Sequence, residues 1–215
     1  MKSRFVFLSL SLVLASSLMS ACAPLMFGSM MGTVMVATDR RTSGAIVEDE
    51  GIELRGNSRM RAHFGERANV SVNSYNRQVL LTGEVANEKD RAAAAQIAER
   101  IENVKSVLNE LAIQPSSSLS EKSKDAFIKG KVIASLVDSK DLFASSFKVV
   151  VERSNVYLMG RVTQREANSV TDMTRTIGGI ARVVRVFEII SEEELRSVLP
   201  TQPKPEASTD AKDKK

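Results

Sequence analysis

The sequence has one histidine and one cysteine, so few side chains are available for metal binding or for nucleophilic catalysis. Zinc sites usually combine several cysteine and histidine ligands, and this composition excludes such a site. His63 lies in the basic segment RMRAHFGER, and Cys22 lies directly after an N-terminal apolar run. We therefore expect no catalytic residue, no metal ligand and no cofactor.

The chain also lacks a strong excess of one charge. It has 30 lysine and arginine residues against 26 aspartate and glutamate residues, and two of the basic ones, Lys2 and Arg4, lie at the extreme N-terminus. Removing them with a cleaved leader leaves 28 against 26, so the overall balance does not indicate nucleic-acid binding. Any electrostatic function must come from a local patch.

No apolar run at the N-terminus is long enough to span a bilayer. Residues 1–21 combine a basic start, an apolar stretch from Phe5 to Met19 and the small residues of MSAC before Cys22, which is typical of a secretory signal peptide. A single cysteine at this point resembles the bacterial lipobox, whose cysteine carries diacylglycerol and an N-linked acyl chain such as palmitate. Met19 departs from the preferred leucine, and the alternative is a plain signal peptide with a chance cysteine. We expect Cys22 to be lipidated.

Residues 22–45 are interpreted as a lipidated linker. By analogy with the sorting rule of enterobacterial lipoproteins, in which aspartate after the cysteine favours inner-membrane retention, Ala23 is compatible with the outer membrane. We expect a lipid-anchored protein on the outer membrane, facing the periplasm. The apolar segment APLMFGSMMGTVMVA either lies along the membrane or serves as a flexible spacer.

Two stretches of the mature chain match each other. Residues 70–113 and 147–190 contain VLLTGEV and VYLMGRV, which share the pattern V-x-L-x-G-x-V 77 residues apart. A period this long, present twice, indicates duplication of a small domain, because a solenoid needs three or more repeats.

Each copy has the pattern of an α-β-β-α-β unit, and we expect an α+β fold. Alternating apolar residues predict two strands joined by a polar turn, followed by a helix and a closing strand over 106–113 or 182–190. Two helices should cover one face of a three-stranded mixed sheet. The first helix of copy one, about 48–63, is predicted to be weak because Gly51 and Gly56 interrupt it, whereas 121–137 is strong.

The expected domains are therefore 46–114 and 119–191, joined by a short polar linker. Residues 192–215 should form a short helix and then a disordered polar tail, because its last stretch contains three prolines and many charges. Gly83 and Gly160 occupy matching strand ends, where a close packing or turn requirement is the simplest interpretation.

This repeat resembles the BON domain, a small module of bacterial envelope proteins. A lipobox, two such domains and a polar tail are similar in order to the dual-BON outer-membrane lipoproteins, and the resemblance runs from ATDRRTSG through SEKSKDAFIKGKV to GGIARV. It implies a non-enzymatic lipoprotein that supports outer-membrane integrity. It also implies that the second BON domain binds anionic phospholipids of the inner leaflet of that membrane.

The stretch KDAFIKGKVIASLV contains one apolar residue that does not fit the core face of its helix. On a wheel of about 100° per residue, Ile128, Val132, Ile133 and Leu136 define that face, and Phe127 lies nearly opposite its centre. The same outer face carries small or apolar residues with lysines beside them: Gly130, Ala134, Val137, Lys124 and Lys131.

Such a face is typical of an interfacial helix that inserts an aromatic side chain among lipid head groups. Lys129 is the misfit, because it falls within the core arc and would have to extend outward along it. Two alternatives to a membrane contact remain: Phe127 packs on the first BON domain, or it is simply exposed.

A different functional class is also open. The protein could be a periplasmic adaptor whose BON domains bind an envelope protein or a peptidoglycan-remodelling factor. The edge strand predicted over 182–190 could then pair with a strand of the partner.

Overall fold

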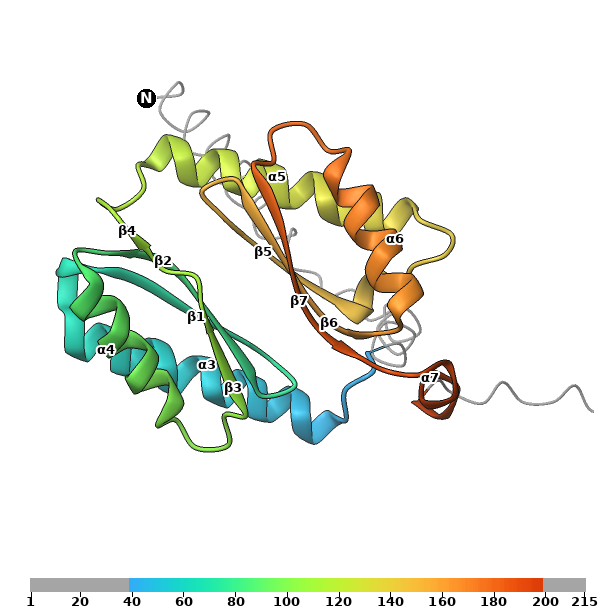
Figure 1. Cartoon of the computed structure of the whole chain (residues 1–215), viewed down its shortest axis with the longest axis horizontal. Coiled ribbons are helices and arrows are strands. Elements are labelled where there is room, and N and C mark those ends of the chain that lie inside the picture. The colour runs from blue at the N-terminus through green and yellow to red at the C-terminus, as the bar shows by residue number, and fades with distance from the viewer. Residues whose placement is uncertain (1–38, 199–215) are drawn as a thin grey trace, which may run out of the picture. The chain divides into compact units, whose positions relative to one another are not determined.

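The computed structural model describes residues 39–198, which belong to one compact unit, Ala37–Lys215. Cys22, the apolar segment after it and the polar tail lie outside the described residues. Within them the chain runs through α-β-β-α-β twice (Figure 1). The first copy comprises α3 (Ser43–Phe64), β1 (Asn69–Tyr75), β2 (Gln78–Val85), α4 (Glu88–Glu99), β3 (Ser106–Asn109) and β4 (Ala112–Ile113).

The second copy comprises α5 (Leu119–Asp138), β5 (Phe147–Glu152), β6 (Asn155–Val162), α6 (Gln164–Arg175) and β7 (Arg182–Ile189), and α7 (Glu192–Val198) follows it. Short 3-10 turns, η2 (Gly65–Arg67) and η3 (Ala144–Ser146), precede the first strand of each copy. The predicted α+β class is confirmed.

Both sheets are mixed, with the second strand of each copy at the centre. β2 pairs antiparallel with β1 and parallel with β3 and β4, and β6 pairs antiparallel with β5 and parallel with β7. The closing strand predicted over 106–113 is divided into β3 and β4, although both keep one register against β2. The break lies beside Gly83, whose φ of 112° turns the backbone of β2 out of the regular strand conformation.

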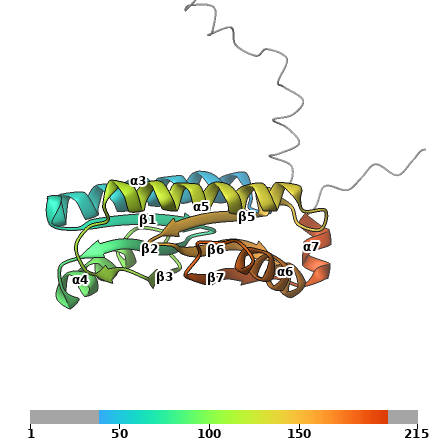
Figure 2. The same ribbon diagram turned by 90° about the horizontal axis from the view of Figure 1, so that it is seen from above.

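The two helices of each copy pack on one face of their own sheet. α3 packs on β1 and α4 on β2 and β3, while α5 packs on β5 and α6 on β6 and β7 (Figure 2). The predicted core positions of the second helix in each copy are buried or half-buried: Ala94, Ile97, Ala98, Val170 and Met173. Ile101 and Ile177, predicted on the same helices, lie just after the ends of α4 and α6 but still join the two cores.

The first helix of copy one is continuous, and the prediction that glycines would interrupt it was wrong. It begins at Ser43, earlier than predicted, because the Thr42 hydroxyl accepts a hydrogen bond from the amide of Ala45 at 3.1 Å and caps the helix. A Cβ atom at Gly56 would lie 2.7 Å from Val72 Cγ1, so this glycine allows the helix to approach the sheet closely.

Each β-hairpin is held by an aspartate from the preceding helix. The buried carboxylate of Asp49 accepts the amides of Asn76 and Arg77, each at 2.7 Å, and that of Asp125 accepts those of Arg153 and Ser154 at 2.6 and 2.7 Å. All four turn residues have positive φ, as a two-residue type I′ turn requires. Asp49 and Asp125 are therefore equivalent positions of the two copies.

The faces of the two sheets that carry no helix are buried together in a third apolar cluster. It contains Tyr75, Leu80, Tyr157, Met159 and Val186. The sequence interpretation explained only one buried face of each sheet. The second face was indicated by adjacent apolar residues, VLL in β2 and VYLM in β6, since a strand buried on both faces loses its alternation.

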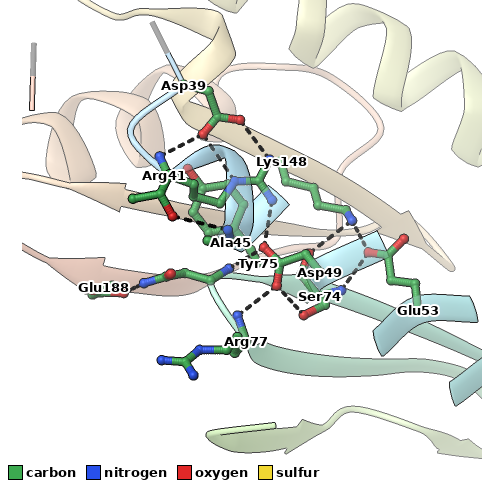
Figure 3. A network of polar contacts seen from close by, with 12 residues as sticks. Asp39, Arg41, Ala45, Asp49, Glu53, Ser74, Tyr75, Arg77, Lys148 and Glu188 are labelled. Carbon is green, nitrogen blue, oxygen red and sulfur yellow. Dashed lines mark hydrogen bonds and ion pairs between the residues drawn. The ribbon is translucent and has the colours of Figure 1, made fainter. Parts of the chain in front are cut away.

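Polar contacts between the copies surround this cluster. Arg153 Nη1 lies 2.9 Å from Glu84 Oε1, Arg182 Nη2 lies 2.5 Å from Glu110 Oε2, and the Tyr75 hydroxyl donates to the carbonyl of Ser146 at 3.3 Å. Figure 3 shows the densest part, where Lys148 bridges the Glu53 carboxylate and the Ser74 carbonyl.

The residues just before α3 dock onto the second copy. Arg40 is buried, and its guanidinium makes two hydrogen bonds, of 2.8 and 2.6 Å, to the buried carboxylate of Glu166 at the start of α6. It also donates to the carbonyl of Arg161 at 3.1 Å. The linker predicted to extend to residue 45 therefore ends earlier, as a fixed part of the fold.

Candidate functional site

Helix α5, which carries the predicted lipid-binding residues, begins with a complete capping box. The Ser118 hydroxyl accepts the amide of Glu121 at 3.3 Å, and the Glu121 carboxylate accepts the amide of Ser118 at 2.8 Å. Its core face contains Ile128, Val132 and Leu136, all buried. These contacts fix which face of α5 points outward.

Phe127 is 68% exposed on that outward face. It therefore does not pack on the first BON domain, which removes one of the two alternatives to a membrane contact. The ammonium of Lys131 lies 5.0 Å from the centre of its ring, within the range of a cation–π interaction.

The apolar outward face of α5 is broader than the sequence predicted. Ile133 was predicted to belong to the core, but it is 42% exposed. On the helical wheel it lies at the border of the core arc, next to Val137 and Gly130, and it joins the predicted small and apolar positions there. The exposed residues of this face are Leu119, Ala126, Phe127, Gly130, Ile133, Ala134 and Val137.

The lysines near this face differ in exposure and in whether their ammonium groups already contact the protein. Lys131 is half-buried, and its ammonium donates to the carbonyl of Gly178 at 2.6 Å, so it is partly held by the protein. Lys124 is exposed on the same flank, as predicted. Lys129 was expected to extend outward from the core arc, but together with Lys122 it is exposed on the opposite flank of the helix.

The equivalent face of α3 also exposes apolar residues, Val47 and Leu54, but it lacks the aromatic ring and the lysines. With Asp49 aligned to Asp125, Gly51 takes the place of Phe127, and Glu48 and Arg55 take the places of Lys124 and Lys131. Arg55 and Glu48 form an ion pair of 2.6 Å, and Arg55 lies over Gly51. The duplicated domains therefore differ at this position, where only the second presents an aromatic ring and lysines.

The two strand glycines have structural rather than chemical roles. A Cβ atom at Gly83 would lie 1.9 Å from the carbonyl oxygen of Asn69, and one at Gly160 would lie 2.7 Å from that of Ser146. Only Gly83 also needs a positive φ. The close-packing interpretation accounts for both.

A polar groove on the inner flank of α5 was not found from the sequence. It has a volume of about 340 Å³ and is lined by both copies: Asn69 and Ser71 from β1, Lys122, Asp125, Ala126 and Lys129 from α5, and Val151 and Glu152 from β5. Burial raises the pKa of Glu152 to about 7, with the carboxylates of Glu84 and Asp125 adding to the effect. No periodicity in the sequence brings β1 to this site, because the contact is between domains.

The remaining candidates from the sequence are the single histidine, a metal site and a membrane span. His63 is exposed in the last turn of α3, beside the ring of Phe64. Within residues 39–198 no three His, Cys, Asp or Glu side chains are grouped as a metal site would need. No helix in this part of the chain has the length and apolar content needed to cross a membrane.

The repeat, the hairpin geometry and the paired helices define a tandem arrangement of one small α+β domain. The chain belongs to the BON family, since the BON domain model matches residues 45–115 and 124–191. It is a DolP-like protein: it is 32% identical to the outer membrane lipoprotein DolP of Haemophilus influenzae over 178 residues, covering 82% of this chain and 92% of that protein.

Two further likenesses are weaker. A 21 kDa hemolysin of Actinobacillus pleuropneumoniae is 27% identical over 154 residues, which cover 71% of this chain and 79% of that protein. Among solved structures, CdsD, a structural protein of the type III secretion system of Chlamydia trachomatis, is 15% identical with a TM-score of 0.29, covering 74% of this chain and 99% of that one.

Proposed function

We propose that this chain is a non-enzymatic outer-membrane lipoprotein, anchored through Cys22 and facing the periplasm, that binds anionic phospholipid through α5. The observation that carries the proposal is Phe127, which is 68% exposed at the edge of an apolar helix face with lysines on both flanks. The similarity to a relative named as an outer membrane lipoprotein supports the location. Through this contact the protein would support the integrity of the membrane.

The energetics of α5 fit a tethered domain. Burying a phenylalanine contributes roughly 1.5–3 kcal/mol, and each lysine near an anionic surface adds about 1 kcal/mol. With two lysines, Lys124 and Lys131, the total of about 3.5–5 kcal/mol corresponds to a dissociation constant near the millimolar range. This is weak for a free protein, but a lipid anchor at Cys22 raises the local concentration enough for such a contact to form.

The test is co-sedimentation of the unacylated mature chain, residues 23–215, with vesicles that contain anionic phospholipid. We expect Phe127→Glu to abolish most of the binding, because it places a carboxylate where the ring would enter the head-group region. Leu54→Glu is the matched control, since Leu54 is 74% exposed on α3. If Phe127→Glu sediments as well as wild type, α5 is not the contact.

One observation favours the second candidate, a periplasmic adaptor. β7 is the outer strand of its sheet, in the order β5-β6-β7, so its outer edge is available for pairing with a strand of another protein. Pull-down with the same chain, in the presence and absence of membranes, separates the two functions. Capture of an envelope protein by a chain that ignores vesicles would favour the adaptor.

A further inference from the structure

We propose that the phosphodiester head group of the bound lipid sits in the groove between α5, β1 and β5, so that the first BON domain forms part of the lipid site. The inference rests on the proposed function of α5 and adds the place of the head group. It assigns this role to Lys122 and Lys129 on the inner flank of α5, rather than to the lysines on the outer flank.

The first argument is the state of the lysines. Lys122 and Lys129 line the groove, are exposed, and their ammonium groups form no hydrogen bond or ion pair within the described residues. Lys131, by contrast, already donates to the carbonyl of Gly178 and lies over the ring of Phe127. These contacts position Phe127 and occupy the Lys131 ammonium. Lys122 and Lys129 are therefore better able to bind a phosphate.

The second argument is continuity with the apolar face of α5. Ala126 is exposed on that face and also lines the groove, so the polar and apolar surfaces meet along one side of the helix. A lipid has the same division, with its phosphate at one end and its acyl chains at the other.

The third argument concerns the acidic groups around the groove. The carboxylate of Asp125 accepts two amide hydrogen bonds, and that of Glu84 is bound by Arg153, Ser117 and Asn69. Glu152 has no hydrogen-bond partner in the described residues, and it faces Glu84, Asp125, Lys122 and Arg153. Because burial raises its pKa to about 7, the groove becomes less positive as the pH rises through neutrality.

The wall opposite α5 comes from the first domain. Asn69 and Ser71 lie on β1 and line the groove, and the Ser71 hydroxyl has no partner in the described part of the chain. The Ser71 hydroxyl and the second N–H of the Asn69 amide, whose first N–H donates to Glu84 at 2.9 Å, are suitable donors to a phosphodiester oxygen. The site is incomplete in the second domain alone, which gives a physical reason for the two domains to be joined.

The lysines are tested by measuring vesicle affinity for the double variant Lys122→Met/Lys129→Met, with Lys140→Met as an exposed control outside the groove. Because each lysine at an anionic surface contributes about fivefold in affinity, we expect a loss of about 25-fold for the double variant and little change for the control. If the double variant binds like wild type while Lys124→Met loses affinity, the head group lies on the outer flank and the inference fails.

The contribution of the first domain is tested by Ser71→Asp, which adds a carboxylate to the groove from β1. We expect at least a fivefold loss of affinity for anionic vesicles, whereas Ser58→Asp, on the exposed surface of α3, should leave it unchanged. NMR shift changes at the amides of residues 69–71 on adding anionic micelles give a second readout. An unchanged affinity for Ser71→Asp with no shift at these amides would overturn the assignment.

The acidic group is tested by pH. Wild type should bind anionic vesicles several-fold more tightly at pH 6 than at pH 8, and Glu152→Gln should remove most of this difference. Equal pH dependence in both would contradict the role of Glu152 in the groove.

The variant Phe127→Glu separates the proposed function of α5 from the inference about the groove. If it abolishes binding while all groove variants bind normally, the helix is the contact and the groove is not.

Discussion

Two carboxylates of the second domain have pKa values shifted in opposite directions because their hydrogen-bond partners differ. Burial alone would raise the pKa of Glu166, but the hydrogen bonds from the Arg40 guanidinium and from the amide of Thr163 hold it below its ordinary value. Glu152 is also partly buried but lacks such a partner, and its pKa is raised to about 7. The first group stabilises the fold when ionised, and the second stabilises it when protonated.

Removing the charge of Glu166 should be strongly destabilising. Glu166→Gln leaves the Arg40 guanidinium buried without a counter-charge, and we expect a loss of about 3–5 kcal/mol in the free energy of unfolding. Glu192→Gln is the control, because its pair with Arg165 is exposed and 3.9 Å long, and such pairs contribute less than about 1 kcal/mol. Urea unfolding of both variants at pH 7 measures the difference, and equal losses would contradict the prediction.

The same pair predicts sensitivity to acid. Since the pKa of Glu166 is lower in the folded state than in the unfolded state, its contribution to the free energy of unfolding is present above the unfolded pKa, near 4.5, and is lost as the pH falls below that value.

The contribution of Glu152 changes with pH in the opposite direction. Its folded pKa is raised, so wild type loses stability as the pH rises from about 4.5 to about 7. Thermal melts of wild type and Glu152→Gln across this range should converge at low pH and diverge towards neutrality, with the variant more stable.

Substitution by alanine should change the free energy of unfolding in opposite directions at Gly83 and Gly130. Gly83→Ala forces a Cβ atom within 1.9 Å of the Asn69 carbonyl oxygen at a φ of 112°, so we expect a loss of about 2–3 kcal/mol or more. Gly130 lies within α5 with nothing near its Cβ position, and Gly130→Ala should stabilise the protein by about 0.5–1 kcal/mol. Similar effects in urea unfolding would contradict this account.

At the scale of elements, the first helix of the second copy has two roles at once. One side of α5 buries apolar residues and places Asp125 under the β5–β6 turn, while the other side presents Phe127. α3 performs the first task with Asp49 but not the second. Duplication has therefore kept the structural side of the helix in both copies while the outward side has diverged.

The aspartate under the hairpin is testable. Asp125→Ala removes the acceptor for two amides in a turn with positive φ, and hydrogen bonds to a charged group contribute about 1.5–3 kcal/mol. We expect a loss in that range, whereas Asp138→Ala, at the exposed end of α5, should change the free energy of unfolding by less than about 0.5 kcal/mol. Urea unfolding of the two variants, with hydrogen exchange at the amides of Arg153 and Ser154, provides the measurement.

At the scale of the whole molecule, the third apolar cluster joins the two domains into one cooperative unit. Leu80 and Tyr157 are fully buried there, one from each central strand. We expect wild type to unfold in one calorimetric transition. Leu80→Asp, which buries a carboxylate between the sheets, should separate the transition into two, while Ile113→Asp at an exposed strand end should not. A single transition for Leu80→Asp would contradict this coupling.

The sequence was sufficient to predict what depends on local pattern. The alternation in β1 and β5, the strong helix predicted over 121–137 and the wheel position of Phe127 each follow from residues close together in the chain. Gly56 and Ile133 were misjudged because the outcome depends on what lies opposite: Val72 leaves room only for a glycine, and no element covers Ile133. A helical wheel predicts the direction of each side chain, but it does not predict which residues of other elements lie opposite that side chain.

The groove lined by Lys122, Lys129 and Ser71 could not be found in the same way. Its parts are separated by about fifty residues in the chain and meet only because Leu80 and Tyr157 bring the sheets together. The exchange of Phe127 for Gly51 between the copies was accessible in principle, but aligning them requires Asp49 and Asp125, whose equivalence is clear only from the turns they bind.

The ion pair between Arg40 and Glu166 determines where a tether on the N-terminal side would act on the folded part of the chain. The described part of the chain starts beside α6, where Arg40 binds Glu166, although the first domain comes earlier in the sequence than the second. A lipid anchor at Cys22, as proposed, would therefore transmit load from the membrane to the domain that carries Phe127 at Arg40, and to the first domain at the next residue, where Arg41 binds Asp49 at 2.8 Å.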